Sequence, residues 1–165
     1  MSNPQNLIFP ELILLNDFEG DFSTFFTTVY EIFKQDFISS NPTFNGLRVS
    51  AQKHPEVDGI HRTFYHITHE GEDEQNRIPD ISRMERIKFP KFIIENEAHP
   101  TVMVWENNRG KDKRVLLFNE HENYLVVLTE RAGYYLFWTA YMVTQPHRRR
   151  KLLQEYEAYI KAKTA

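Results

Sequence analysis

Two hydroxyl side chains in the last third of the chain are the first candidates for chemistry. Thr139 and Tyr141 fall in segment 134–143, where residue types alternate as they do in a strand. A strand of that register places both hydroxyls on one face, about 7 Å apart, together with Tyr135 and Phe137. Hydroxyl groups donate hydrogen bonds to phosphate oxygens, and a tyrosine ring can stack on a nucleobase. Threonine and tyrosine also favour strands, so β propensity alone explains this pair as well.

A run of four cations follows Pro146 and comprises Arg148, Arg149, Arg150 and Lys151. Proline is favoured in the first turn of a helix, so the run falls where a C-terminal helix is predicted to begin. Cations at that position oppose the helix dipole by roughly 0.3–1 kcal/mol each at low salt. A bound phosphate would offset this repulsion, and so would simple solvation of the helix. The four side chains are therefore candidates for nucleic-acid binding.

His66 and three arginines complete the set of candidates. His66 lies in segment 63–68, which we predict to be a strand, and a neutral imidazole can act as general acid or base near pH 7. Arg83 and Arg86 are one helical turn apart and are expected to project together toward a phosphate, unless neighbouring acids neutralise them. Arg131 lies at the end of a predicted strand next to a turn. A single histidine in a strand is more often structural than catalytic.

The elements that must position these groups begin with helices. Phenylalanines recur at helical spacing behind two possible N-caps, Asp21 and Ser23, and predict a helix that faces the core. A second helix is expected from Asp80 or Ser82. Pro90 should kink this helix, stop it, or begin a new helix at its first turn.

Strands are expected mainly in the second half of the chain. The predicted strands cover residues 47–51, 63–68, 102–106, 114–119, 124–130 and 134–143. Short turns join the last four, which indicates an antiparallel meander. In the last strand, the face opposite Thr139 is expected to be core and carries Leu136, Trp138, Ala140 and Met142. The predicted fold is α+β, with N-terminal helices followed by a four-stranded antiparallel meander sheet and a C-terminal helix.

The bulk composition limits the class of protein. With 165 residues, 41% of them hydrophobic, we expect one domain, in which residues 1–40 form an acidic N-terminal helical extension and residues 41–165 the core. Residues 144–165 hold six basic side chains against two acidic ones, which indicates an end that faces a polyanion. Cysteine is absent, and we expect neither a metal nor another cofactor. We also expect a cytoplasmic protein without a membrane-spanning segment, and leave its oligomeric state open.

Several short segments of the sequence follow one another in the same order as in a known family, which they resemble. They are Asp58-Gly59, Thr63–Ile67, Arg77–Asp80, Met84–Pro90, Val104–Asn107, Tyr124–Leu128, Trp138–Tyr141 and Lys151–Tyr159. Over residues 44–163 this order resembles small prophage-associated proteins of the barnase–EndoU–colicin–RelE-like nuclease group. The resemblance implies helices followed by a four-stranded antiparallel sheet, and metal-independent cleavage of RNA, often by a toxin. By position, the residues that match the family's motifs are His66, Arg86, Arg131, Thr139 and Tyr141.

The resemblance and the basic residues together point to a ribonuclease. His66, or Glu106 if it reaches the site, would deprotonate the ribose 2′-hydroxyl, and Arg86 and Arg131 would stabilise the phosphoryl oxygens as a 2′,3′-cyclic phosphate forms. RNA is the expected partner, and an antitoxin or inhibitor protein a further one. The first alternative is a non-catalytic RNA- or single-strand-binding protein. The second is a phage-associated protein-interaction module whose exposed apolar patch would comprise Tyr135, Phe137 and Tyr141.

Overall fold

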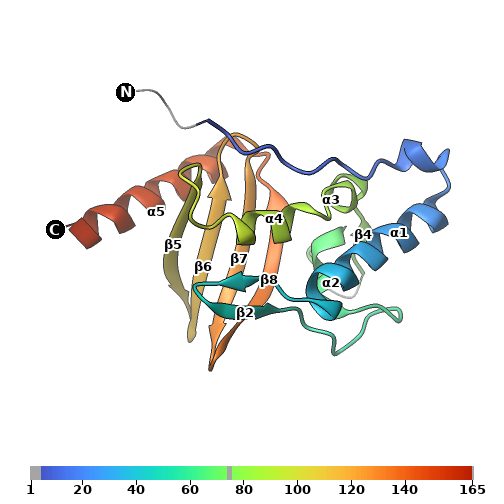
Figure 1. Ribbon diagram of the computed structural model, residues 1–165, viewed down its shortest axis with the longest axis horizontal. Coiled ribbons are helices and arrows are strands. Elements are labelled where there is room, and N and C mark those ends of the chain that lie inside the picture. Colours follow the sequence, from blue (N-terminus) through green and yellow to red (C-terminus); the bar gives the residue numbers. More distant parts are fainter. Residues whose placement is uncertain (1–4, 74–75, 165) are drawn as a thin grey trace.

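A six-stranded, strongly curved sheet forms the centre of the computed structural model, which describes residues 5–73 and 76–164 (Figure 1). Its order is β1-β2-β8-β7-β6-β5. The strands are β1 (Thr43–Phe44), β2 (Leu47–Ser50), β5 (Val102–Arg109), β6 (Asp112–Asn119), β7 (Tyr124–Arg131) and β8 (Tyr134–Met142). Two short strands form a separate pair, β3 (His69–Glu70) and β4 (Ile78–Pro79). Residues 1–4 of the expected N-terminal extension lie outside the described residues.

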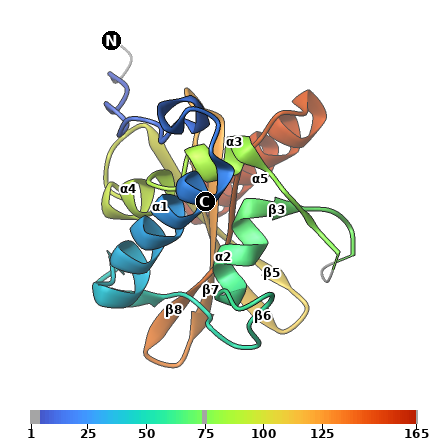
Figure 2. The same ribbon diagram turned by 90° about the vertical axis from the view of Figure 1, so that its right-hand side faces the viewer.

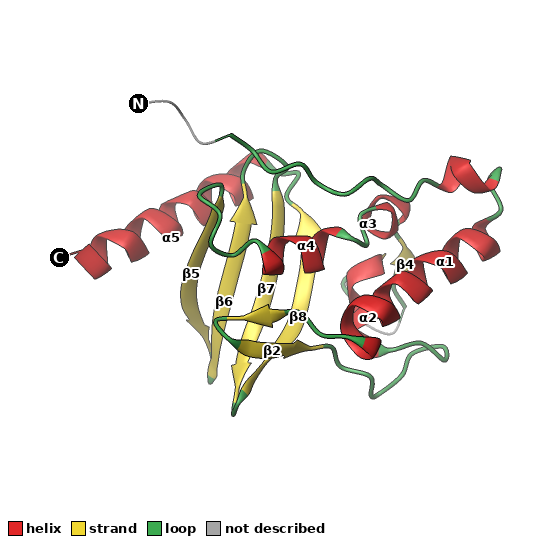
Figure 3. Cartoon of the chain, viewed as in Figure 1, coloured by secondary structure: helices red, strands yellow, loops and turns green. Residues whose placement is uncertain are grey.

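Helices cover both faces of this sheet, as the colouring by secondary structure shows (Figure 3). The α-helices are α1 (Phe22–Lys34), α2 (Arg62–Thr68), α3 (Ile81–Glu85), α4 (Phe89–Glu95) and α5 (Pro146–Thr164). A 3₁₀ helix (Leu15–Phe18) precedes α1, and a π-helical turn (Gln35–Ser39) continues it. In the view turned by 90°, α1 and α4 lie on one side of the strands and α5 on the other (Figure 2). Within the described residues, no helix is long and apolar enough to cross a membrane.

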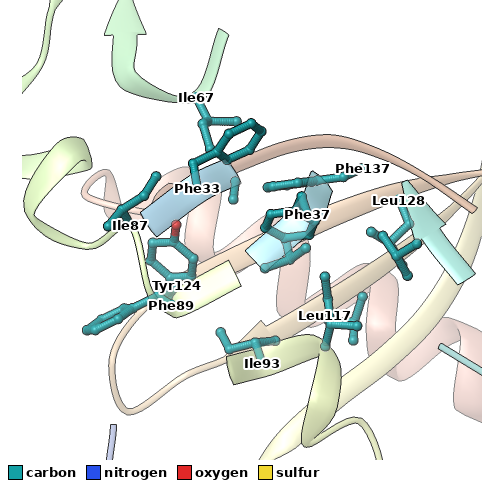
Figure 4. Close-up of a cluster of buried hydrophobic side chains, with 14 of the residues drawn as sticks. Phe33, Phe37, Ile67, Ile87, Phe89, Ile93, Leu117, Tyr124, Leu128 and Phe137 are labelled. Carbon is teal, nitrogen blue, oxygen red and sulfur yellow. The ribbon is translucent and has the colours of Figure 1, made fainter. Parts of the chain in front are cut away.

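The larger hydrophobic core fills the space between the sheet and helices α1, α2 and α4 (Figure 4). Helix α1 supplies Phe25, Val29 and Phe33 to it, all three fully buried. Leu117 and Leu128 meet them from β6 and β7. The helix of the acidic N-terminal segment is thus packed into the same core as the sheet.

Local sequence signals account for the helix starts. Asp21 is the N-cap of α1, and its carboxylate accepts hydrogen bonds from the backbone N–H and the hydroxyl of Thr24. Asp80 caps α3 in the same way through the N–H of Arg83. Pro90 stands in the first turn of α4 and so begins a new helix, the third of the predicted outcomes.

The sheet is not the predicted four-stranded antiparallel meander. The four predicted strands are present as β5 to β8, but β2 adds to β8 in parallel, with Val49 opposite Tyr135, and β1 pairs with β2. The helices are also not all N-terminal, because α2, α3 and α4 lie between β2 and β5 in the chain. An unpaired β8 edge would expose its N–H and C=O groups, and β2 satisfies part of them. This pairing joins residues far apart in sequence, so local spacing gives no sign of it.

Residues 63–68 form helix α2 and not the predicted strand. Aromatic and β-branched residues gave the segment its strand-like composition. Its buried residues instead include Phe64, Ile67 and Thr68, at the i, i+3, i+4 spacing of a helix. Phe64 packs on α1, with its ring centroid 4.6 Å from that of Tyr30 and 5.2 Å from that of Phe33. Tertiary packing here outweighs the local strand propensity.

A β-bulge in β8 overturns the predicted division of that strand into faces. The partner of Val127 is Thr139 and the partner of Leu128 is Phe137, so Trp138 is an extra residue in β8. Beyond the bulge the alternation changes sides. Tyr135 and Phe137 are therefore core residues, 6% and 1% exposed, whereas Trp138 is 37% exposed.

Candidate functional site

A cavity of about 510 Å³ opens on the sheet face that α5 covers only in part. Its lining includes five arginines: Arg77, Arg83, Arg109, Arg114 and Arg148. They come from the loop before β4, from α3, from the end of β5, from β6 and from α5. We call this space the arginine cavity. So many guanidinium groups around one small volume favour an anion, because each carries a permanent charge and a planar set of donors.

The strands supply the polar floor of the cavity. Asn107 in β5 and Arg114 in β6 are directly opposite each other in the register, and both line it. Thr139 and Tyr141 reach it from β8, beyond the bulge at Trp138. The extra residue in β8 therefore carries the two hydroxyl side chains away from the core and into the cavity.

Arg114 is a partly buried cation of the cavity. Its Nε atom is buried and has no hydrogen-bond partner in the part of the chain that the structure describes. Its guanidinium carbon lies 5.4 Å from the centroid of the Trp138 ring, in the geometry of a cation–π contact. Burial, followed by the nearby charge of Arg109, lowers the pKa of Arg114 from its ordinary value. A bound anion would relieve both the desolvation and the repulsion.

Tyr141 is held between two of the arginines. Arg148 donates from Nη2 to the Tyr141 hydroxyl oxygen over 3.2 Å. The guanidinium carbon of Arg83 lies 5.9 Å from the centroid of the same ring. Arg83 is itself fixed by the Asp80 carboxylate, 3.4 Å away, and by the carbonyl of His69. Because the hydroxyl oxygen accepts from Arg148, its own hydrogen points elsewhere and is placed to donate to a ligand.

Glu155 of α5 is the one carboxylate among the described residues that line the cavity. Its Oε1 accepts hydrogen bonds from Trp105 Nε1 (3.1 Å) and Asn107 Nδ2 (2.6 Å). Both donors are neutral, so within the described residues these contacts leave the carboxylate charge uncompensated by an ion pair. Among the described lining residues five arginines face this one carboxylate, and although Asp80 pairs with Arg83 from outside the lining, positive charge predominates there.

His66 lies where the arginine cavity meets a second one. The second cavity measures about 630 Å³, and both include His66 and Trp138 in their lining. The two rings have centroids 6.1 Å apart. Helix α2 sets the direction of His66, since Phe64 and Ile67 of that helix are fixed in the core. The backbone carbonyl of His66 also accepts from Arg77 Nη1 (3.2 Å).

The structure brings together half of the residues predicted for the site. The arginine cavity includes His66, Arg83, Thr139, Tyr141 and Arg148. Arg131 lies in the second cavity, where its Nη1 is 3.3 Å from Asp112. The residues that line neither cavity are Arg86, Arg149, Arg150 and Lys151.

Helix geometry explains why these cations diverge. Arg86 is the first residue after α3 and donates back to the hydroxyl and carbonyl of Ser82, so it does not project with Arg83 as predicted. Successive residues of α5 point about 100° apart. Arg149 therefore turns away from Arg148 and pairs with Glu120 at 3.2 Å.

Two further expectations have a plain structural outcome. Glu106 does not reach the arginine cavity, because it lies beside Lys113 (3.1 Å) and accepts a hydrogen bond from the Tyr159 hydroxyl. The exposed apolar patch expected for a protein-interaction module does not form, because Tyr135 and Phe137 are buried.

Sequence reasoning missed five residues that define the cavity: Asn107, Arg109, Arg114, Trp138 and Glu155. A signal was present for one of them. Arg114 stands two residues from Leu116 in a predicted strand, so the two side chains were expected to share a face, whereas Asn107 follows the predicted end of its strand at residue 106. Where polar residues continue an apolar face of a strand, the element packed on that face is expected to end.

Comparisons with protein-family models, with curated proteins and with solved structures find no match for this chain. The resemblance to the nuclease group therefore stays a prediction. Among residues 5–73 and 76–164, no group of three histidine, aspartate or glutamate side chains is arranged to hold a metal ion.

Proposed function

We propose that the protein binds RNA through the arginine cavity and cleaves its phosphodiester backbone by attack of the 2′-hydroxyl. The observation that carries this proposal is the convergence of five arginines, two hydroxyl side chains and one histidine on one cavity, with a single carboxylate among the lining residues that the structure describes. One arginine guanidinium can bind two oxygens of the same phosphate group. Its charge also stabilises a phosphoryl group that becomes more negative during the reaction. The sequence resemblance to metal-independent nucleases points to the same chemistry.

The side chains divide into acid, base and charge-stabilising roles. His66 accepts the proton of the 2′-hydroxyl, whose oxygen then attacks the adjacent phosphorus. Arg114 and Arg83 stabilise the extra charge on the phosphoryl oxygens. The bond from phosphorus to the 5′-oxygen breaks, and that oxygen takes a proton from the hydroxyl of Tyr141, which Arg148 orients. The products are a 2′,3′-cyclic phosphate and a free 5′-hydroxyl.

This assignment moves charge stabilisation away from the two arginines expected for it. Arg86 is engaged with Ser82 outside both cavities, and Arg131 is paired with Asp112 in the second cavity. Arg83, Arg114 and Arg148 surround the hydroxyl side chains instead.

The test is incubation of the purified full chain with total bacterial RNA in the presence of EDTA. We expect fragments that end in 2′,3′-cyclic phosphate. His66→Ala should cost at least about 10²-fold in rate, the lower end of what general acid–base catalysis contributes. Arg114→Ala should lose cleavage and most of the binding, whereas Arg86→Ala, one arginine outside the cavity, should cleave like the wild type.

The outcomes separate binding from catalysis. Retarded RNA on a native gel without any fragments would overturn the catalytic part and leave a non-catalytic RNA-binding protein. Intact RNA without retardation would overturn the whole proposal. Circular dichroism of Arg114→Ala checks that its loss of function is not a loss of fold.

A further inference from the structure

We infer that the second cavity is a nucleobase site, and that the protein acts on single-stranded RNA with one base stacked on Trp138 and the adjoining phosphate in the arginine cavity. The inference rests on the proposed function and adds the substrate class and a recognition site to it. We call the second cavity the base cavity.

The two cavities form one continuous binding surface. His66 and Trp138 line both of them, and their volumes are about 630 and 510 Å³. Each is by itself within the roughly 300–1,000 Å³ typical of sites that enclose a whole small molecule. A single phosphate group therefore fills only part of this surface, and a base with its ribose fits beside it.

Trp138 is placed as the platform between phosphate and base. The bulge of β8 turns it out of the core, and 37% of its surface is exposed, whereas Trp105 is 1% exposed. Arg114 lies 5.4 Å from its ring on the side of the arginine cavity. An exposed indole beside a cluster of phosphate-binding arginines is the arrangement by which proteins hold single strands, because every base offers a face for stacking.

The base cavity offers groups that can read the edge of a base. Gln52 donates from Nε2 to the carbonyl of His54 (2.8 Å), which fixes its side-chain amide and leaves Oε1 as an acceptor. The Ser50 hydroxyl can donate or accept. Arg62 adds a planar cation that can stack or donate. Among the described residues, no carboxylate lines this cavity, so its charge also suits RNA.

These groups favour a single strand over a duplex. A base can lie against Trp138 only when it has left its own stack, and Gln52 and Ser50 can reach its edge only when that edge is not paired. The sheet surface with an exposed aromatic residue is the kind of platform on which unpaired bases are bound.

The two tryptophans make the inference directly measurable by fluorescence. The full-length protein is titrated with a 2′-deoxy dinucleotide, which lacks the attacking hydroxyl and stays intact, and separately with inorganic phosphate. We expect the dinucleotide to quench the emission of Trp138, and inorganic phosphate to compete with it without quenching. Calorimetry then gives the affinities of variants that lack the fluorescence signal.

Two substitutions at one position separate stacking from folding. Trp138→Ala should weaken dinucleotide binding by roughly 5- to 150-fold, the range that stacking of a base on an aromatic side chain contributes. Because Trp138 also contacts Arg114 in the arginine cavity, the affinity for inorganic phosphate should fall too, but by less than the affinity for the dinucleotide. Trp138→Phe keeps a stacking ring and should bind the dinucleotide within a few-fold of the wild type.

Failure of the inference and failure of the proposed function give different results. A wild-type protein that binds neither inorganic phosphate nor the dinucleotide would overturn both. Normal binding of both ligands without quenching, and with unchanged affinity in Trp138→Ala, would overturn the base site alone. Equal affinity for a short RNA duplex and for its single strand would likewise contradict the inference and leave RNA binding standing.

Discussion

Strands β5 to β8 contribute to both faces of the sheet, yet one face is covered and the other is half open. On the covered face, Val115, Leu117, Val126 and Leu128 alternate along β6 and β7 and are buried beneath helices. The opposite face begins in the same way, with an apolar cluster under Leu152 of α5.

The open half differs from the covered half in the side chains of the strands themselves. Where Asn107, Arg114 and Thr139 replace apolar residues, α5 contributes the polar side chains of Arg148 and Glu155 and no apolar cover, and the arginine cavity remains. Burial of an unpaired guanidinium costs several kcal/mol, which no packing contact of comparable size offsets. We therefore propose that the covered face carries the stability of the fold and the open face carries binding.

The largest effect is expected on the covered face. Phe33→Ala should lower the free energy of unfolding by about 3–5 kcal/mol, because Phe33 is fully buried between Phe37 and Phe64. Guanidinium chloride denaturation measures this loss. Phe22→Ala in the same helix, at a position that is 39% exposed, should cost much less. A loss for Phe33→Ala as small as that for Phe22→Ala would mean that α1 is not part of the core.

On the open face, neighbouring arginines of α5 should behave differently. Arg148→Ala should weaken binding of single-stranded RNA about tenfold and reduce the slope of log affinity against log salt by about one, since one phosphate contact is lost. Arg150→Ala should change neither quantity, because Arg150 is exposed and lines neither cavity. Fluorescence anisotropy at several salt concentrations gives both values. An equal loss for the two variants would indicate that RNA binds to the positive charge of α5 as a whole and not to a defined site.

A smaller effect of opposite sign is expected at Glu155. Glu155→Gln should tighten RNA binding by a few-fold, because it removes the negative charge among the arginines, worth on the order of 1 kcal/mol at the separations of a solvated pair. The amide oxygen can still accept from Trp105 and Asn107, so the fold is kept. Glu157→Gln, at an exposed position of the same helix, is the control. Tighter binding with lost cleavage would assign Glu155 a part in proton transfer.

The smallest effect concerns pH and a histidine that lines neither cavity. Burial lowers the pKa of His69, whose ring stacks on Tyr65 and whose Nδ1 is 3.1 Å from the Tyr65 carbonyl. Below its ordinary pKa, near 6.5, the unfolded chain therefore binds more protons than the folded protein, so the free energy of unfolding should fall as pH drops. Urea denaturation at pH 7.5 and 5.5 measures the fall, which His69→Gln should reduce. An undiminished fall in that variant would place the proton uptake elsewhere.

Much of the fold could be predicted because its signals are local. The phenylalanine spacing and the Asp21 cap identify α1, and short turns identify β5 to β8. The parallel pairing of β2 with β8 could not be predicted, since it joins distant segments. Helix α2 was mistaken for a strand because its residue types favour strands and only its packing on α1 decides for a helix.

The candidate site was predicted only in part, because only some of its signals are local in the sequence. Thr139 and Tyr141 are two residues apart and share a face in any register of β8. The prediction that they lie together is therefore correct, although the division of the whole strand into faces was wrong. Trp138 could not be assigned correctly, because a bulge depends on the pairing of β8 with β7 and leaves no mark in β8 alone. Arg114 was overlooked as a site residue although its strand was predicted, since no residue across the sheet identified its face as the open one. Arg109 was overlooked because the predicted strand ended at residue 106, whereas β5 continues to Arg109.

The spread of the cavity along the chain has a consequence for a protein proposed to cut RNA. His66, Arg114 and Glu155 come from segments that are made at widely separated moments of translation. The cavity cannot close around an anion until the residues up to Glu155 have been synthesised, even though α1 and the first strands have emerged long before. If the protein cuts RNA as proposed, a nascent chain that still lacks Glu155 has an incomplete cavity while it is in contact with messenger and ribosomal RNA.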